Sequence, residues 1–327
     1  MVTLISMSLH LNLSLMSRHP LIRSHKRNRS VSAQAFRVRY LRRSRELYRR
    51  FLERKPWISQ LYRQFLGLRP GLRIVDVGCG TGDFTRYLVR LCSGRCTAIG
   101  VDNRKLSLQA AIGDTRREGL AKQISYKLGD ALSVPIEDDY SDLTCCRTVL
   151  MHLRDPQKAV SEMTRVTKPG GLIAAIEGGR MVSFVDPRDE EYTELSYETN
   201  LAWLRAIKKL EGKEFKIGER LPSIFQETGL RDIQSEIHAD AWLYCDPRRR
   251  LEDIKAELRF ESSLSRESRR RDRKYLEKGG ISRANISRYY RKYDRRVKEL
   301  LSDDKKLRTD ASFYGATFVL VTGRKGP

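Results

Sequence analysis

The stretch Arg73-Ile-Val-Asp-Val-Gly-Cys-Gly-Thr-Gly-Asp-Phe-Thr85 decides the fold of this chain. An apolar run that carries one acid, Asp76, breaks into glycines at alternate positions, Gly78, Gly80 and Gly82. A helix-compatible stretch follows over 83–92. This order predicts a buried strand, a tight turn and the start of a helix, which is where α/β proteins hold a nucleotide-like ligand.

The residues around the glycines narrow the class of ligand. A dinucleotide fingerprint needs a third glycine where this chain has Asp83, and a Walker loop needs Gly-Lys-Ser/Thr, which is absent. A second acid, Asp102, follows the apolar stretch 97–101 and suits hydrogen bonds to ribose hydroxyls. Asp76 suits a cationic amino group, because a carboxylate repels phosphate. The predicted ligand is therefore a nucleoside that carries an amino acid and no phosphate.

This pattern resembles the class I S-adenosylmethionine-dependent methyltransferases, specifically the small-molecule group with ubiquinone-biosynthesis-like motifs (type 11). The resemblance runs in order over about residues 73–177. Its downstream matches are Gly129-Asp130-Ala131, the fourth-strand segment 142–153, the helix and turn over 162–171, and the fifth strand over 172–176. It implies a Rossmann-like fold and S-adenosylmethionine as the cofactor.

The resemblance also implies roles for single residues in cofactor binding. Asp102 would hold the ribose and Asp130 the adenine amino group, while the backbone at Gly78 and Gly80 would pass close to the methionine part. Arg147, at the end of the fourth strand, could approach the cofactor carboxylate. The predicted cofactor-binding residues are Asp76, Gly78, Gly80, Asp102, Asp130, Ala131 and Arg147.

Two further residues are candidates for catalysis or substrate contact. A sulfonium makes its methyl group electrophilic, so transfer needs alignment and desolvation, and the protein need not supply a nucleophile. His152 follows the fourth strand, and its titration range suits a general base, although such a histidine also serves to orient the loop. Glu177, at the carboxyl end of the fifth strand, is predicted to face the ligand crevice and contact substrate.

The rest of the chain extends this core into a larger α/β fold. We expect a doubly wound, seven-stranded sheet with an antiparallel last strand, within one methyltransferase domain over 36–327. Its predicted parts are N-terminal helices over 36–69, a cofactor-binding core over 71–178 and a helical insertion over 247–308. The insertion lies between strands predicted over 232–242 and 314–322. It is the predicted location of substrate specificity.

The first 35 residues differ in composition from the rest. No acid occurs between Met1 and Arg45, while arginines accumulate from Arg18 onward. We predict a flexible basic arm over 1–35 with no structure of its own. The same composition fits an organellar transit peptide, or a start assigned too far upstream of Met7 or Met16.

Aromatic residues and leucines recur at helical spacing from Phe36 to Phe65 with arginines between them. Pro56 is predicted to divide this segment into two helices. One interpretation is a helix that packs its aromatic face onto the sheet. The other is a lid whose aromatic side chains form one wall of the substrate pocket.

The net charge of +23 supports a competing interpretation. Arginine clusters near Tyr289, Tyr290 and Tyr293 resemble an RNA-binding surface. The signatures of base-directed methyltransferases are absent after the fourth strand, and the charge could equally serve an anionic small substrate or a membrane surface. Small-molecule methyl transfer is the preferred prediction. RNA- or ribosome-directed methyl transfer and non-catalytic cofactor binding are the alternatives.

The six cysteines do not form a disulfide framework. Cys92 and Cys96 have the spacing of half a metal site but no second pair, so free thiols and no metal site are predicted. Free thiols favour a reducing compartment, and we expect the cytoplasm, with organellar import as the alternative. No apolar stretch approaches the ~20 residues that a membrane-spanning helix needs. The sequence does not indicate an oligomeric state.

Overall fold

The computed structural model describes residues 55–181 and 189–327. Contacts within the chain divide these residues into two compact units. The sheet unit comprises described residues 55–178, 216–237 and 319–327, and the helical unit comprises 179–181, 189–215 and 238–318. The predicted arm over 1–35 and the first part of the predicted N-terminal helices, up to residue 54, lie outside the described residues.

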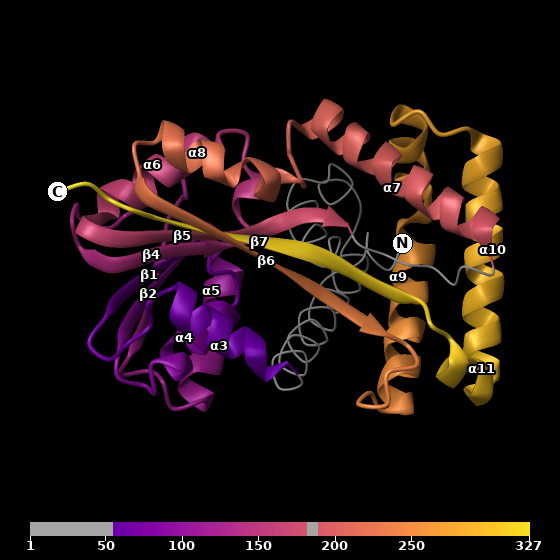
Figure 1. Cartoon of the computed structure of the whole chain (residues 1–327), viewed down its shortest axis with the longest axis horizontal. Coiled ribbons are helices and arrows are strands. Elements are labelled where there is room, and N and C mark those ends of the chain that lie inside the picture. The colour runs from indigo at the N-terminus through magenta and orange to yellow at the C-terminus, as the bar shows by residue number, and fades with distance from the viewer. Residues whose placement is uncertain (1–54, 182–188) are drawn as a thin grey trace, which may run out of the picture. The chain divides into compact units, whose positions relative to one another are not determined.

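Seven strands form one mixed sheet in the order β3-β2-β1-β4-β5-β7-β6 (Figure 1). Their bounds are β1 Arg73–Val77, β2 Thr97–Asp102, β3 Ile124–Leu128, β4 Ser141–Arg147, β5 Thr167–Met181, β6 Arg231–Leu243 and β7 Phe313–Arg324. Strands β1 to β5 pair in parallel. The Gly170 amide donates to the Lys325 carbonyl, and the Lys325 amide donates to the Gly171 carbonyl. These bonds join the start of β5 to the end of β7, so β7 runs antiparallel to β5. The predicted fold class is confirmed.

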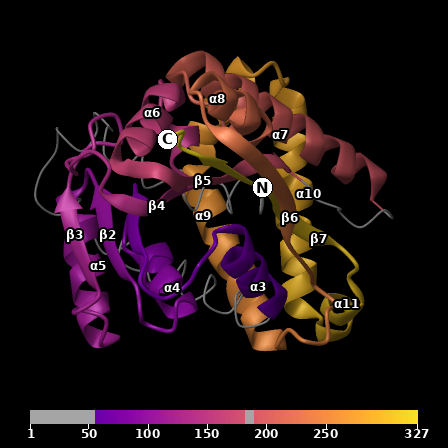
Figure 2. The ribbon, with the colours of Figure 1, turned by 60° about the vertical axis from the view of Figure 1, so that its left-hand side comes forward.

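Helices cover both faces of the sheet in the sheet unit (Figure 2). Helices α3 Pro56–Phe65, α4 Asp83–Leu91 and α5 Lys105–Arg117 lie on one face, and α6 Pro156–Val166 and α8 Leu221–Glu227 lie on the other. Two 3-10 turns, η2 Leu150–His152 and η3 Ile217–Arg220, complete this unit. Parallel strands are buried on both faces, which is why Ile74, Cys145 and Ile173 have no exposed surface.

Helix α3 begins at Pro56, the residue predicted to divide the N-terminal helices, because proline is tolerated in the first helical turn. Its buried face carries Ile58 and Tyr62. The Tyr62 ring lies 6.1 Å from Phe84 and 6.0 Å from Tyr87, both on α4. The described part of the N-terminal helices thus packs its apolar face into the sheet unit.

The described residues of the helical unit form four helices. They are α7 Glu190–Glu211, α9 Leu251–Lys278, α10 Arg283–Ser302 and α11 Asp304–Thr309. The predicted insertion is therefore helical, and Gly279–Gly280 separates α9 from α10 as expected. A methyl group on Gly279 would collide with the carbonyl of Ala202, so glycine lets the end of α9 approach α7 closely.

The predicted surface of interleaved arginines and tyrosines does not form. Tyr289, Tyr290 and Tyr293 lie in the core of the helical unit with at most 2% of their surface exposed. The prediction was wrong for these residues because they share the inward face of α10, where packing decides their position.

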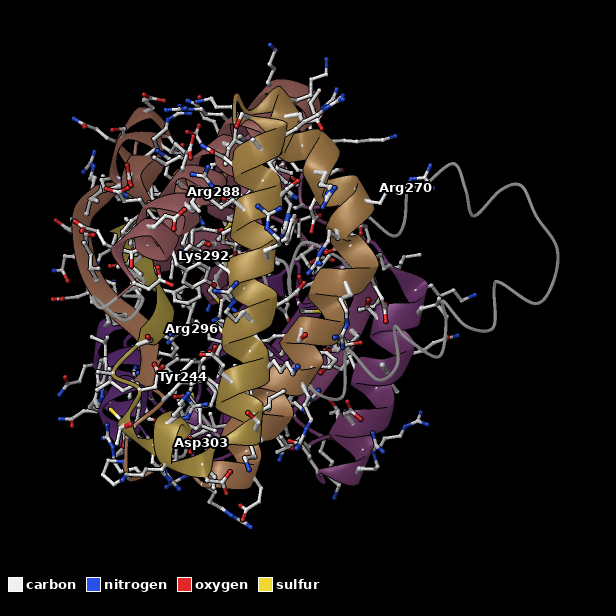
Figure 3. The ribbon with its side chains drawn as sticks, turned by 90° about the vertical axis from the view of Figure 1, so that its right-hand side faces the viewer. Tyr244, Arg270, Arg288, Lys292, Arg296 and Asp303 are labelled. Carbon is white, nitrogen blue, oxygen red and sulfur yellow. The ribbon has the colours of Figure 1, made fainter. Side chains whose placement is uncertain are left out.

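Part of the positive charge on α10 is neutralised within the unit. Lys292 binds Asp189 at 2.8 Å, and Arg296 binds Asp310 at 2.5 Å. Together with Arg288, which binds Glu191, these cations recur at four-residue intervals along one edge of α10 (Figure 3). Among the described residues, no helix is long and apolar enough to cross a membrane.

Candidate functional site

The predicted site residues gather where the strand order reverses. Strand β1 lies between β2 and β4, so the connections from β1 and β4 leave the sheet in opposite directions. In open α/β sheets this switch point opens a crevice at the carboxyl ends of the strands. The glycine loop follows β1, Asp102 ends β2 and Arg147 ends β4.

The glycine loop has a backbone that only glycine adopts without strain. Gly78, Gly80 and Gly82 have φ angles of +73°, +55° and +72°. The amides of Gly78 and Cys79 both donate to the carbonyl of Val101 on β2. A side chain on Gly78 would collide with Val149, whereas no atom lies within 4 Å of a Cβ built on Gly80. The open side of the loop is therefore at Gly80.

A buried arginine that is not among the predicted site residues fixes the far end of this loop. The Arg86 guanidinium donates to the carbonyl of Thr81 at 2.8 Å and to Asp83 at 2.8 Å, and it binds Glu118 at 2.9 Å. Only 3% of its surface is exposed. The three-residue spacing from Asp83 to Arg86 is one helical turn, and that pattern could have revealed the pair.

Asp76 lies inside the sheet beneath the loop. Its carboxylate accepts a 2.5 Å hydrogen bond from the Thr85 hydroxyl, and Thr85 was not among the predicted site residues. Burial raises the pKa of Asp76 from 3.8 to about 7, and the Asp102 charge adds to this rise. The Thr85 hydrogen bond and the Arg147 charge act in the opposite direction. A cation brought to this carboxylate would therefore find a group close to its titration midpoint at neutral pH.

Asp102 ends β2 and Asp130 follows the neighbouring strand β3, so both lie at the carboxyl edge of the sheet. One oxygen of Asp102 accepts from the Gly80 amide and the other from the Arg104 amide, each at 2.9 Å. The Gly129 amide donates to the Asp102 carbonyl, which brings the third-strand loop alongside. Asp130 is exposed, with one oxygen on the Leu132 amide, and Ala131 is half-buried.

Arg147 lies within electrostatic reach of two buried carboxyls. Its charge lowers the pKa of Asp76 and of Glu177, although burial dominates and holds both at about 7. Its guanidinium lies 5.9 Å from the centre of the Phe84 ring. His152 is half-buried at the end of η2. The structure thus places a cation and a histidine on the two sides of the turn that follows β4.

Glu177 does not line an open crevice, in contrast to the prediction. Its side chain is completely buried, and Oε1 accepts from the amides of Val149 and Leu150 at 2.7 and 2.8 Å. The Met151 amide approaches Oε2 at 3.4 Å. The signal for this arrangement lies in the fold and not in the sequence, because β5 must first be placed beside β4. Direct contact of Glu177 with a substrate stays a prediction.

The arrangement suits the predicted nucleoside that carries an amino acid. An exposed acid, a strand-end acid and an open glycine backbone follow three neighbouring strands. The arginine at the loop, Arg86, is already bound by Asp83 and Glu118, so its charge is neutralised within the protein. Asp76, whose pKa is about 7, adds a partly ionised carboxyl group near the loop at neutral pH. The described residues contain no cluster of three or more His, Cys, Asp or Glu side chains that could hold a metal ion.

This fold and this donor set define the cofactor domain of a class I methyltransferase. Residues 75–175 match the family model described as a methyltransferase domain. The matched segment therefore belongs to the class I S-adenosylmethionine-dependent methyltransferases, whose cofactor is S-adenosylmethionine.

Curated relatives match over the same kind of segment. Ubiquinone/menaquinone biosynthesis C-methyltransferase UbiE of Vibrio vulnificus is 31% identical over 43% of this chain and 55% of its own length. Demethylmenaquinone methyltransferase of Bacillus pumilus is 28% identical over 56% of this chain and 80% of its own length. The solved structure of YcgJ from Bacillus subtilis covers 82% of this chain and 98% of its own, at 19% identity and a TM-score of 0.46. The chain spans about half the length of the first of these relatives.

Proposed function

We propose that this protein transfers a methyl group from S-adenosylmethionine to a small-molecule acceptor. The observation that carries the proposal is the glycine loop, which is open at Gly80 and tied by its amide to the acid at the end of β2. When bound, the cofactor supplies an electrophilic methyl group on a sulfonium. The protein's task is then to align and desolvate the reactants.

The chain's own residues divide this task. Asp102 and the exposed Asp130 would hold the ribose and the adenine amino group, and the backbone at Gly80 would line the amino-acid part. Asp76 would offset the positive charge of the amino group, because a buried carboxylate gains most from a nearby cation. Arg147 places a positive charge near the loop, where it would bind the cofactor carboxylate.

Proton removal from the acceptor falls to His152 in this proposal. It is half-buried in the turn after β4, and an imidazole titrates in the range that suits a general base at neutral pH. If the acceptor needs no base, His152 would contact the substrate or orient the turn. Replacement by Gln separates these roles, because Gln keeps a polar side chain but cannot remove a proton at neutral pH.

The acceptor class is inferred from relatives and from the missing signatures of base-directed enzymes. The names of the curated relatives describe carbon methylation in quinone biosynthesis, which supports a small organic acceptor for this chain. No described feature favours RNA over a small molecule, since the tyrosines of α10 are buried. All six cysteines are free, which supports a reducing compartment such as the cytoplasm.

Incubation with methyl-labelled S-adenosylmethionine tests the proposal. The protein is given separated metabolite, RNA and protein fractions of its source cell, and label is expected in the metabolite fraction. The G80A variant serves as the control for enzyme-dependent transfer. Label in RNA would overturn the acceptor class, and cofactor binding without label in any fraction would support a non-catalytic role.

A further inference from the structure

We propose that Glu177 is a positioning residue that holds the turn between β4 and η2 against the glycine loop. The role rests on the proposed function, because it matters only if the loop binds the cofactor. Glu177 contacts neither cofactor nor substrate in this proposal. It acts through the backbone of residues 149–151, which it fixes from below.

The carboxylate of Glu177 is fully used within the protein. It is completely buried on β5, and the three consecutive amides of residues 149–151 point at it. Two of these amides share one oxygen at 2.7 and 2.8 Å. Buried amides without an acceptor are costly, so this one side chain determines whether the turn is stable.

The turn needs such a support because its backbone is strained. Thr148 has a φ angle of +55°, a region that a β-branched residue rarely adopts. Its amide donates to the Ile176 carbonyl at 2.9 Å, which joins the strained residue to the strand that carries Glu177. Strain of this kind persists where the surrounding contacts fix the backbone, and it concentrates at functional sites.

The supported turn contacts the cofactor loop directly. A methyl group built on Gly78 would lie 2.5 Å from Cγ2 of Val149, so the Val149 side chain fills the space over Gly78. Val149 is also the residue whose amide makes the shortest bond to Glu177. A displaced turn would therefore release the loop at one end and move His152 at the other.

The groups around the carboxylate match this role. Arg147 is the cation whose charge favours the ionised form, together with the three amides, while burial opposes it. The Cys146 thiol lies 4.0 Å from Oε1. A neutral glutamine can still accept two amide bonds through its single oxygen, but its NH₂ group would face the Met151 amide. Gln should thus preserve part of the support, and methionine should preserve none.

Amide hydrogen exchange of the full chain tests the support itself. We compare wild type, E177Q and E177M with D142N as the matched control. Asp142 also holds a strand-end amide, that of Arg73 at 2.7 Å, but at the opposite end of β1 from the loop. Exchange at residues 149–151 is expected to rise strongly in E177M, less in E177Q and not in D142N. Unchanged exchange at these amides in E177M and E177Q would overturn the proposal.

Calorimetric titration with S-adenosylmethionine tests the consequence for the cofactor loop. E177M should weaken binding by about tenfold or more, which is the scale expected when buried amides lose their acceptor. E177Q should fall between E177M and wild type, and D142N should match wild type. Equal affinities in E177M and D142N, despite faster exchange in the turn, would overturn the link to the loop. A wild-type protein that bound no S-adenosylmethionine would overturn the proposed function, while the exchange result would still decide the support of the turn.

Discussion

The amide of Gly80 donates a 2.9 Å hydrogen bond to Oδ2 of Asp102. This bond joins the open point of the glycine loop to the acid that ends the neighbouring strand. One Asp102 oxygen is therefore engaged with the loop before any ligand arrives. The residue that sequence patterns assign to the ribose also stabilises the loop, so the two functions can be separated by substitution.

Replacement of Asp102 by Asn and by Ala should have different effects. Asn keeps an oxygen for the Gly80 amide but turns its NH₂ group towards the Arg104 amide, so D102N should lose less stability than D102A and still bind S-adenosylmethionine more weakly. Ala leaves the half-buried Gly80 amide without its acceptor, which costs about 1 kcal/mol. D102A should thus lose stability as well as affinity. Denaturant unfolding and calorimetric titration measure the two quantities, and equal stability of both variants would contradict a role in holding the loop.

The glycines of the loop should tolerate alanine unequally. G80A adds backbone strain of about 1–2 kcal/mol, the usual cost of the left-handed region. G78A adds the same strain plus a collision with Val149, and overpacking adds about 1–3 kcal/mol. G80A should nevertheless reduce cofactor binding severely, because its methyl group occupies the open side of the loop.

Gly67 provides the matched control for these two variants. It has a φ of +57° and no atom within 4 Å of a built side chain, but it lies outside the loop. G67A should show the backbone cost alone, with unchanged cofactor affinity. Shortening Val149 to alanine should restore part of the stability of G78A and none of that of G80A. If G67A weakened cofactor binding as much as G80A, the open side of the loop would not be the binding surface.

The sequence predicted the elements whose signal is local. Glycine spacing and apolar runs were enough to predict β1, the loop over 78–82 and the acid Asp102. The structure places these three features together. Glu177 could not be placed in this way. Its partners are backbone amides 26 to 28 residues earlier in the chain, and amides carry no residue-type signal.

The same distinction explains why the prediction of an arginine and tyrosine surface on α10 was wrong. Tyrosines and arginines are interleaved along this segment, a pattern that indicates an exposed surface carrying both residue types. At helical spacing, however, Tyr289, Tyr290 and Tyr293 fall on the inward side, while Arg291 and Arg295 stay exposed. Only the packing of α7 and α9 against α10 determines which side is inward.

Asp76 should make the stability of the protein depend on pH. Its pKa is about 7 in the folded chain and near 3.8 when unfolded. Between these values the folded chain holds a proton that the unfolded chain has lost, so this group lowers the free energy of unfolding as the pH rises from about 4 to 7. Above pH 7 its contribution is constant. The full effect cannot exceed about 4 kcal/mol, at 1.36 kcal/mol per pKa unit.

Denaturant unfolding of wild type and D76N over this pH range isolates the contribution. Asn cannot titrate but can still accept from the Thr85 hydroxyl, so the difference between the two proteins reports Asp76. D76N should gain stability relative to wild type as the pH rises from 4 to 7. Acids whose pKa is lowered, such as Asp142 and Glu162, cancel in this comparison because both proteins contain them. A difference that stays flat across the range would contradict a raised pKa.

Gly279 should be the least replaceable glycine of the helical unit. Its φ is an ordinary −81°, so alanine there causes no backbone strain. The cost of G279A comes from the collision with the Ala202 carbonyl on α7, for which overpacking of about 1–3 kcal/mol is typical. G280A is the matched control, because Gly280 has a φ of +101° and an open surrounding, so its cost is backbone strain at the turn itself. Amide hydrogen exchange should rise in α7 around Ala202 for G279A and not for G280A. Equal exchange in α7 for both variants would mean that the close approach of α9 to α7 does not require glycine.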